Sequence, residues 1–184
     1  MNYFDAQQYQ NIKELQAGEY ENCRFAECNF GDQNFSEFKF IDCSFINCNL
    51  SLVKISNATF RDVLFDQCKM LGLHFDTCNK FGLSVTFNNC NLQSCSFYQT
   101  LLKNTSFTNC DLTETDFTEC DLTNAVFDTC NLLYATFDQS ILEKTDFRTA
   151  NHFILSPEKN RLKKTLFSKE NLVGLVSHLD IKLE

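Results

Sequence analysis

Large hydrophobic residues recur at every fifth position along most of this chain. Counting in fives from Phe87 to Phe147 meets thirteen residues that are alternately Phe and Leu. A similar series of large residues runs from Tyr20 to Phe75. A period of five matches neither the 3.6-residue turn of an amphipathic helix nor the two-residue alternation of a strand. It indicates a solenoid, in which each unit packs only against its neighbours.

The residue two positions before each large residue is small. From Cys90 to Thr145 it is always Cys, Thr, Ala or Ser, and all 11 cysteines of the chain fall on this position. The other three positions are mostly polar. Two inward and three outward positions describe one side of a coil, and a four-sided coil would place Phe on two opposite sides and Leu on the other two. With only 5 glycines and 1 proline, the bends must be built from other residues.

The blocks CDLTE, TDFTE, CDLTN, AVFDT, CNLLY and ATFDQ follow the pattern small, polar, Phe or Leu, and two further residues. This pattern resembles the pentapeptide-repeat family, and the resemblance covers residues 18–149. It implies an all-β fold, a right-handed quadrilateral parallel β-helix with about 20 residues per coil. Neighbouring coils would then stack as β-ladders about 4.8 Å apart.

The five-residue period is interrupted near both ends and once in the middle. Residues 1–17 fit it poorly and are expected to cap the first coil, which would otherwise expose a strand edge. Phe75 and Phe87 are 12 residues apart, two more than two repeats. A small distortion is therefore expected within 76–86, as a bulge near residues 80–83. A tolerated surface bulge and a binding knob are both open for it.

Residues 150–184 are expected to form a C-terminal capping or dimerisation segment. Phe167 would belong to a last rung, Ser168 would cap a short α-helix over about 169–179, and residues 180–183 would form a closing strand. The segment resembles the C-termini of Qnr-like and microcin-immunity pentapeptide proteins, which implies a homodimer. A simple cap on a monomer is the alternative. The candidate dimer residues are Leu172, Leu175, Val176, Leu179 and Ile181.

The cysteines are expected to fill the interior. Their odd number argues against a fully paired disulfide framework, and reduced thiols fit a reducing compartment. There is no C-x-x-C pair of the kind that zinc sites use. The first residues show no signal peptide, and no apolar run approaches the roughly 20 residues of a membrane helix. We therefore expect a cytoplasmic protein that binds no metal.

Catalysis is not expected. The sequence has no G-x-S-x-G motif, no Gly-rich phosphate loop and no acidic metal motif. A coil filled with Phe and Leu offers no cleft in which a nucleophile and a base could meet a substrate. A binding protein without cofactor or enzymatic activity is the prediction.

Acidic residues are concentrated in the second half of the repeat region. The formal net charge is −8, and residues 101–147 hold nine acids and two bases. This block would span roughly 11 Å of the rod, in which B-DNA carries about six or seven charges. The side of Phe117 and Phe137 is expected to collect acids without a base. The candidate partner-binding residues are Asp111, Glu114, Asp116, Glu119, Asp121, Asp128 and Asp138.

Two functions are compatible with this sequence. Qnr-like and microcin-immunity members of the family bind DNA gyrase or topoisomerase IV and protect it from inhibitors such as quinolones. The resemblance thus implies a DNA mimic, and the long loops of the plasmid Qnr proteins are absent here. The alternative is a scaffold with an unknown protein partner, whose outward acids merely keep the rod soluble. The acidic balance argues against direct binding to nucleic acid or an anionic membrane.

Overall fold

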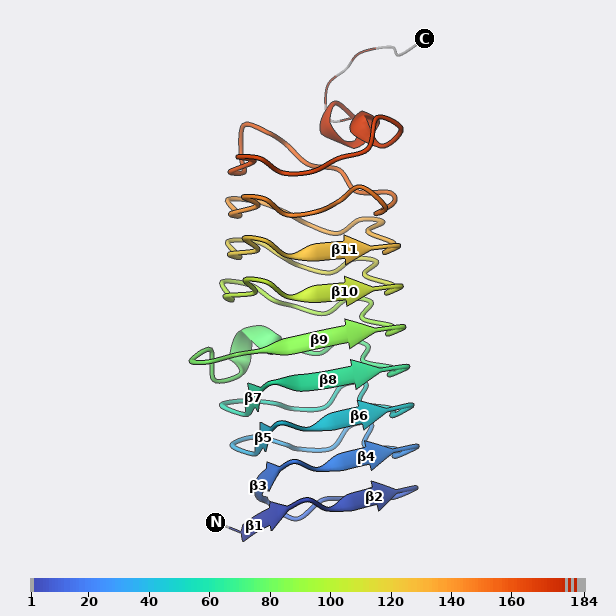
Figure 1. Ribbon diagram of the computed structural model, residues 1–184, viewed down its shortest axis with the longest axis vertical. Coiled ribbons are helices and arrows are strands. Elements are labelled where there is room, and N and C mark those ends of the chain that lie inside the picture. The colour runs from blue at the N-terminus through green and yellow to red at the C-terminus, as the bar shows by residue number, and fades with distance from the viewer. Residues whose placement is uncertain (1, 178, 180, 182–184) are drawn as a thin grey trace.

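The protein is a four-sided rod of stacked parallel coils (Figure 1). This computed structural model describes residues 2–177, 179 and 181. The predicted all-β parallel β-helix is confirmed. One side carries a four-stranded sheet of β1 (Asn2–Asp5), β3 (Gly18–Glu21), β5 (Lys39–Ile41) and β7 (Thr59–Arg61). The next side carries a seven-stranded sheet of β2 (Gln8–Gln10), β4 (Arg24–Ala26), β6 (Ser44–Ile46), β8 (Val63–Asp66), β9 (Val85–Asn88), β10 (Ser106–Thr108) and β11 (Val126–Asp128).

The coils stack in register with a 20-residue offset. Phe107 lies opposite Phe127 in the β10–β11 pair, and isolated bridges such as Asn91 to Asp111 continue the ladders on the other sides. We name the four sides by the large residues beneath them. They are side A (Phe87, Phe107, Phe127), side B (Leu92, Leu112, Leu132), side C (Phe97, Phe117, Phe137) and side D (Leu102, Leu122, Leu142).

The core is a double stack of phenylalanine rings. On side A, Phe107 and Phe127 stack with ring centroids 4.9 Å apart, and on side C, Phe97 and Phe117 stack at 5.3 Å. The two stacks meet edge to face in the centre, where the Phe107 and Phe117 rings are 5.9 Å apart at 83°. In the coils from Phe87 to Phe147 the expected placement of Phe on two opposite sides and Leu on the other two is therefore confirmed, whereas in the first coils Tyr20, Phe40 and Phe60 form a third stack on the side of β3, β5 and β7. Offset and edge-to-face contacts are the arrangements that aromatic quadrupoles favour.

The corners explain how the coil turns with so few glycines. The residue two positions after each large one adopts a left-handed backbone in almost every repeat, as at Asn109 (φ 52°), Glu114 (φ 58°) and Asn124 (φ 58°). Asn and Asp tolerate this region best among non-glycine residues. Leu52 (φ 59°) and Tyr134 (φ 60°) occupy it with bulkier side chains.

The N-terminal segment forms a short coil of its own. Asn2 pairs with Gly18 and Gln8 pairs with Arg24, so this coil has 16 residues in place of 20. The ring of Phe4 stacks on Tyr20 at 4.7 Å. The first regular coil is thus covered by residues that depart from the period.

The distortion in the middle of the rod lies where the spacing places it. β8 pairs with β9 at an offset of 22 residues, because Val63 lies opposite Val85. The extra residues follow the 3-10 helix η1 (Phe75–Thr77) and protrude from the rod before β9 (Figure 1). Phe81 lies in this protrusion with 80% of its surface exposed, next to Gly82 in a left-handed turn (φ 71°).

The C-terminal segment corrects one prediction. In place of an α-helix over 169–179, the described residues form a single 3-10 turn, η2 (Leu172–Leu175). Gly174 weakens a helix and is pressed against Phe153, while the Asn171 side chain is tied to the Phe147 carbonyl at 2.7 Å. Ser168 still accepts a hydrogen bond from the Asn171 N–H (3.3 Å). The predicted closing strand at 180–183 lies almost wholly outside the described residues.

Candidate interaction surfaces

Four of the seven candidate acids lie together. Asp111 and Glu114 belong to side B and its corner, and Asp116 and Glu119 follow on side C and its corner. We call these four residues the acidic band; they cross two adjacent sides of one coil. The other three lie on other sides or coils: Asp121 follows Glu119 on side D, Asp128 lies on side A in β11, and Asp138 lies one coil further along side C.

Ion pairs compensate part of the negative charge that was predicted for residues 101–147. Asp121 pairs with Lys103 at 3.0 Å, and Asp138 lies 3.8 Å from Lys159. The expectation that side C carries acids without a base is therefore wrong, because Lys159 reaches it from a later, irregular coil. No residue of the acidic band has an ion-pair partner within the described part of the chain. Within the acidic block, the four residues of the band and Asp128 are the acids without an ion pair among the described residues.

Two acids of the band have a structural task as well. Asp111 and Asp116 each accept the backbone N–H two residues ahead, from Thr113 (3.1 Å) and Thr118 (2.9 Å). This is the Asx turn that short polar side chains favour. Asparagine does the same work at Asn91, whose side chain accepts the Gln93 N–H at 3.1 Å. Polar residues directly before each Phe or Leu were a signal for this role that the sequence reasoning missed.

Asp111 is the most engaged carboxylate of the band. It accepts hydrogen bonds from the Thr113 hydroxyl (2.6 Å), the Gln93 amide (2.6 Å) and the Asn131 amide (3.2 Å). Partial burial raises its pKa, but these hydrogen bonds outweigh burial and hold the pKa below its usual value. Asp111 therefore stays charged while its oxygens are turned toward the protein.

The two glutamates of the band are exposed corner residues. Glu114 accepts from the Ser94 hydroxyl (3.0 Å), and Glu119 accepts from the Gln99 amide (2.7 Å) and the Tyr98 hydroxyl (3.2 Å). Partial burial and the neighbouring Glu119 carboxylate raise the pKa of Tyr98. These contacts to the previous coil orient the glutamates while leaving them accessible.

All 11 cysteines are free and buried, as interior fillers would be. Cys90, Cys110 and Cys130 stack in one column, and each thiol contacts a backbone carbonyl of the previous coil, as Cys110 does with Phe87 at 3.5 Å. Burial raises the pKa of Cys95 to about 12. Among the described residues, no group of three or more His, Cys, Asp and Glu side chains could hold a metal ion.

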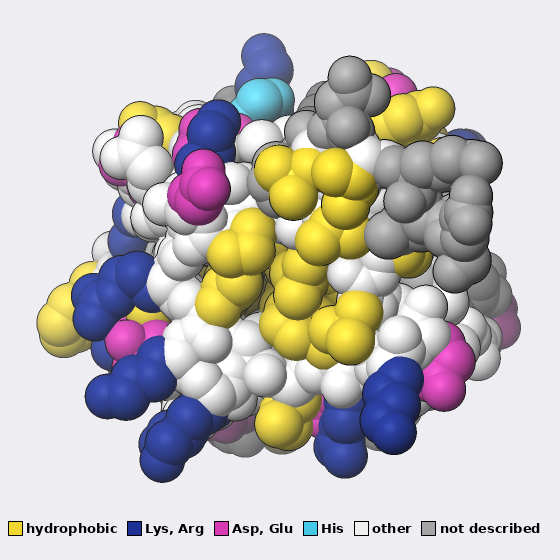
Figure 2. Space-filling view, turned by 90° about the horizontal axis from the view of Figure 1, so that it is seen from above, with side chains coloured by type: hydrophobic (Ala, Val, Ile, Leu, Met, Phe, Trp, Pro, Cys, Tyr) yellow, Lys and Arg dark blue, Asp and Glu magenta, His cyan; other side chains and the backbone are white. Residues whose placement is uncertain are grey.

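The C-terminal end of the rod presents a hydrophobic patch. Seen from that end, hydrophobic side chains gather near the centre of the surface (Figure 2). Of the candidate dimer residues, Leu172, Leu179 and Ile181 are exposed, and Val176 is half-buried. Leu175 packs against the core instead, so the predicted apolar face is split between core and surface.

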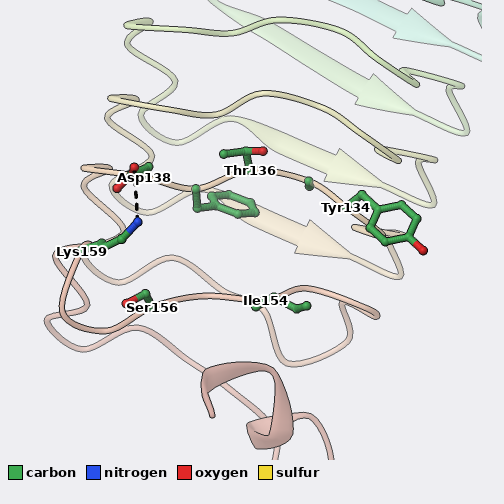
Figure 3. A pocket seen from close by; sticks show the side chains of 8 residues that line it. Tyr134, Thr136, Asp138, Ile154, Ser156 and Lys159 are labelled. Atoms are coloured by element: carbon green, nitrogen blue, oxygen red, sulfur yellow. Dashed lines mark ion pairs between the residues drawn. The ribbon is translucent and has the colours of Figure 1, made fainter. Parts of the chain in front are cut away.

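An open slot beside this end was not predicted. It lies between residues 134–138 and residues 154–159 and has a volume of about 410 Å³ (Figure 3). Its lining residues are Tyr134, Ala135, Thr136, Phe137, Asp138, Ile154, Ser156 and Lys159. The loss of the five-residue period after Phe147 was the sequence signal for it.

Within the described residues, no helix has the length and apolar character needed to span a membrane.

Comparison with known proteins identifies the repeat. The sequence model described as "Pentapeptide repeat region" matches residues 19–80 and 83–152, so its match is interrupted at the protruding Phe81 and Gly82. No curated protein sequence matches this chain. Among solved structures, one trypsin-treated variant of QnrB1 aligns over 100% of both chains, with a TM-score of 0.66 and 15% identity. A second aligns over 98% of this chain and 99% of its own, with a TM-score of 0.62 and 20% identity. QnrB1 is described as a plasmid-mediated fluoroquinolone resistance protein.

Proposed function

This chain belongs to the pentapeptide-repeat family, and from that premise we propose that it is a non-enzymatic binding protein whose acidic band occupies the DNA-binding groove of DNA gyrase or topoisomerase IV. In binding there it modulates the enzyme and protects it from inhibitors such as quinolones. The observation that carries the proposal is a rigid rod with four uncompensated carboxylates on two adjacent sides of one coil.

Electrostatics supports this choice of partner. A protein groove that binds DNA is lined by Lys and Arg side chains. Their positive potential, which attracts DNA, also attracts an acidic rod. Bases cluster instead on the C-terminal part of the chain, where residues 148–184 hold seven bases and four acids. The band would therefore face the enzyme while the basic end is kept away from its groove. The buried reduced thiols suit the cytoplasm, where these enzymes act.

A charge-neutral band tests the proposal without disturbing the fold. The variant combines Asp111→Asn, Glu114→Gln, Asp116→Asn and Glu119→Gln. Asparagine preserves the turn hydrogen bonds, because Asn91 and Asn131 already hold equivalent positions. The matched control removes the same charge from exposed corners of the first coils, with Glu27→Gln, Asp32→Asn, Glu37→Gln and Asp42→Asn.

The readout is gyrase supercoiling and topoisomerase IV decatenation, each with and without a quinolone. The wild-type protein should inhibit or protect at micromolar concentration, the neutral band should lose at least about tenfold in potency, and the control should keep most of it. Absence of any effect of the wild-type protein on both enzymes would contradict the proposal. Equal losses in both variants would show that net charge, and not the band, is responsible.

We further propose that the hydrophobic C-terminal end forms a homodimer. Leu172 and Val173 are 45% and 49% exposed there, in a patch that water would otherwise cover. Leu172→Asp with Val173→Asp should convert a dimer to a monomer in light scattering after size exclusion. Leu52→Asp, at a similarly exposed position far along the rod, should leave the mass unchanged. A monomeric wild-type protein at tens of micromolar would contradict this arrangement.

A further inference from the structure

Regular coils of this rod close on one another through a fixed set of hydrogen bonds. The N–H of each large residue on side C reaches the next coil, as from Phe117 to the Thr136 carbonyl (2.9 Å). The N–H of each corner residue before it does the same, as from Glu114 to the Leu133 carbonyl (2.9 Å). The carbonyl of Thr115 accepts the Thr136 N–H (2.9 Å). Donor, acceptor and donor thus alternate along each rung.

The rung of residues 134–137 lacks these partners. A second gap, at the Ile55 N–H and the Val53 carbonyl, faces the coil that contains η1, and there the corner N–H groups of Leu52 and Asn57 still bond to the next coil. Among the hydrogen bonds of the described residues, the N–H groups of Tyr134 and Phe137 find no acceptor, and the carbonyl of Ala135 accepts no donor. These are the equivalents of Glu114, Phe117 and Thr115 one coil earlier. All three line the open slot. The slot is therefore bounded by a short unpaired strand edge that faces along the rod axis.

The next coil is attached to this rung on either side of the gap but not within it. Asn151 still bridges to Asn131, but the Leu155 N–H bonds instead to the Gly174 carbonyl (2.9 Å) in the C-terminal turn. At the far end, the buried Asn160 side chain accepts the Ser140 N–H (2.9 Å) and donates to the Phe137 carbonyl (3.0 Å). The attachments at Asn151 and Asn160 therefore fix the backbone on both sides of the gap and keep it open.

The remaining walls are mostly apolar, with one charged end. Ile154 is 53% exposed and Tyr134 is 72% exposed, and both border the slot. Lys159 sits at the other end, 3.8 Å from Asp138, with most of its side chain exposed (Figure 3). At this separation the ion pair is loose and worth little, so Lys159 can take a second carboxylate.

We propose that the slot binds an extended peptide segment of a partner protein by adding it as a parallel strand. Backbone carbonyls of the peptide accept from Tyr134 and Phe137, and a peptide N–H donates to Ala135. An apolar peptide side chain rests against Ile154, and an acidic residue next to it pairs with Lys159. Main-chain pairing at an open sheet edge is an established mode of peptide recognition. The slot adjoins the acidic band, because Thr136 pairs with Asp116, but peptide binding there does not depend on the function proposed for the band.

The probe is a fluorescent, end-blocked peptide with the sequence of residues 133–139, LYATFDQ. Successive coils of the rod present similar sequences to one another, so this peptide offers the rung that is missing. Its Thr carbonyl would accept from Phe137 as Thr136 accepts from Phe117. A control peptide is methylated on the backbone nitrogen of that Thr, which removes the donor for Ala135 and keeps every side chain.

Fluorescence anisotropy should show saturable binding with a Kd below about 100 μM, and the methylated peptide should bind at least about tenfold more weakly. In NMR spectra of the full chain, the Tyr134 and Phe137 amides should exchange with deuterium faster than those of Glu114 and Phe117. The peptide should slow the exchange at Tyr134 and Phe137. No binding, or equal binding of both peptides, overturns the proposal.

A pair of variants separates the slot from nonspecific adsorption. Ile154→Asp should weaken peptide binding at least about tenfold, while Leu101→Asp, which places the same charge at an exposed aliphatic position on a fully paired rung, should not. NMR spectra of each variant confirm that it is folded. If a chain shortened after residue 177 instead bound the peptide about tenfold more tightly, the C-terminal residues would be the occupant, and the assignment to a partner protein would be overturned.

Discussion

Two coils separated by one other, residues 107–126 and residues 147–166, follow the same path, but only the first pairs along its whole length. In the first, Phe107, Leu112, Phe117 and Leu122 are fully buried and every side pairs with the coils on either side. In the second, pairing survives at Arg161 and Leu166 and fails between 152 and 158. The difference teaches that closure depends on the spacing within each five-residue unit. Where that spacing is lost, between residues 152 and 158, the backbone pairing between coils is interrupted, while the other sides of the coil remain paired.

The largest expected effect tests the aromatic stack within this comparison. Phe117 in the closed coil has stacked rings on both sides, Phe97 at 5.3 Å and Phe137 at 5.0 Å. Phe167, directly after the open coil, is half-buried and stacks parallel only on Phe147 (5.6 Å). Phe117→Ala should lower the free energy of unfolding by about 3–5 kcal/mol, and Phe167→Ala by clearly less. Urea unfolding of both measures it, and equal losses would mean that the end coil is packed as tightly as the centre.

The second prediction concerns the turn that closes the open coil. A Cβ on Gly174 would lie 2.5 Å from the Phe153 carbonyl oxygen, so backbone must move. Gly174→Ala should cost about 1–3 kcal/mol. At Gly31 in a closed coil, the nearest atom to an added Cβ is the Asn49 amide nitrogen at 3.0 Å, which a side-chain rotation can relieve. Gly31→Ala should cost less than about 1 kcal/mol, and the opposite order in thermal unfolding would refute this account.

The repeat itself made most of the fold predictable. A five-residue period fixed which side chains enter the core, and the two-residue excess before Phe87 located the protrusion that carries Phe81. The prediction of a C-terminal α-helix is wrong because tertiary contacts decide the backbone there. Gly174 packs against Phe153 and the Asn171 side chain binds the Phe147 carbonyl, and a helical sequence pattern does not report such contacts. The acidic residues were found, but the pairing of Asp138 with Lys159 joins irregular segments, and no periodicity reports such a contact.

The third prediction uses low pH to probe the hydrogen bonds that the Asp111 carboxylate accepts in the closed coil. Hydrogen bonds hold the pKa of Asp111 below its usual value despite partial burial. The unfolded chain, with an Asp pKa near about 3.9, therefore takes up this proton first as the pH falls. The stabilisation from Asp111 is complete above that pKa and is lost as the pH drops through the lower folded value. Asp111→Asn should flatten the decline of the urea midpoint between about pH 5 and pH 2.

Thr113→Val serves as the partner experiment. It removes the hydroxyl that donates to Asp111 at 2.6 Å and keeps the volume of the side chain. Stability should fall at pH 7, and the loss should shrink as the pH drops and the carboxyl becomes protonated in the folded state as well. An unchanged pH profile in both variants would show that Asp111 does not carry the acid sensitivity.

The fourth prediction tests the left-handed backbone conformation at the corners of the coil. Leu52 holds a left-handed backbone (φ 59°) with its side chain 59% exposed, so it gains little from burial and carries the steric cost of that conformation. Leu52→Asn should raise the free energy of unfolding by about 0.5–1 kcal/mol, since Asn tolerates this region better. The reverse change at a corner that is already Asn, Asn109→Leu, should lower it by a similar amount or more, because Asn109 also donates to Asn89 at 2.8 Å.

The smallest expected effect separates a structural thiol from a functional one. Cys110 donates to the Phe87 carbonyl at 3.5 Å, while Thr115, at the same position of the next repeat, donates its hydroxyl to the Leu92 carbonyl at 3.0 Å. A hydroxyl therefore satisfies the same acceptor, and Cys110→Ser should change stability by no more than about 1 kcal/mol. Gyrase inhibition and peptide binding should also be unchanged. A large loss of either activity in a folded Cys110→Ser protein would show that the column of cysteines does more than fill the coil.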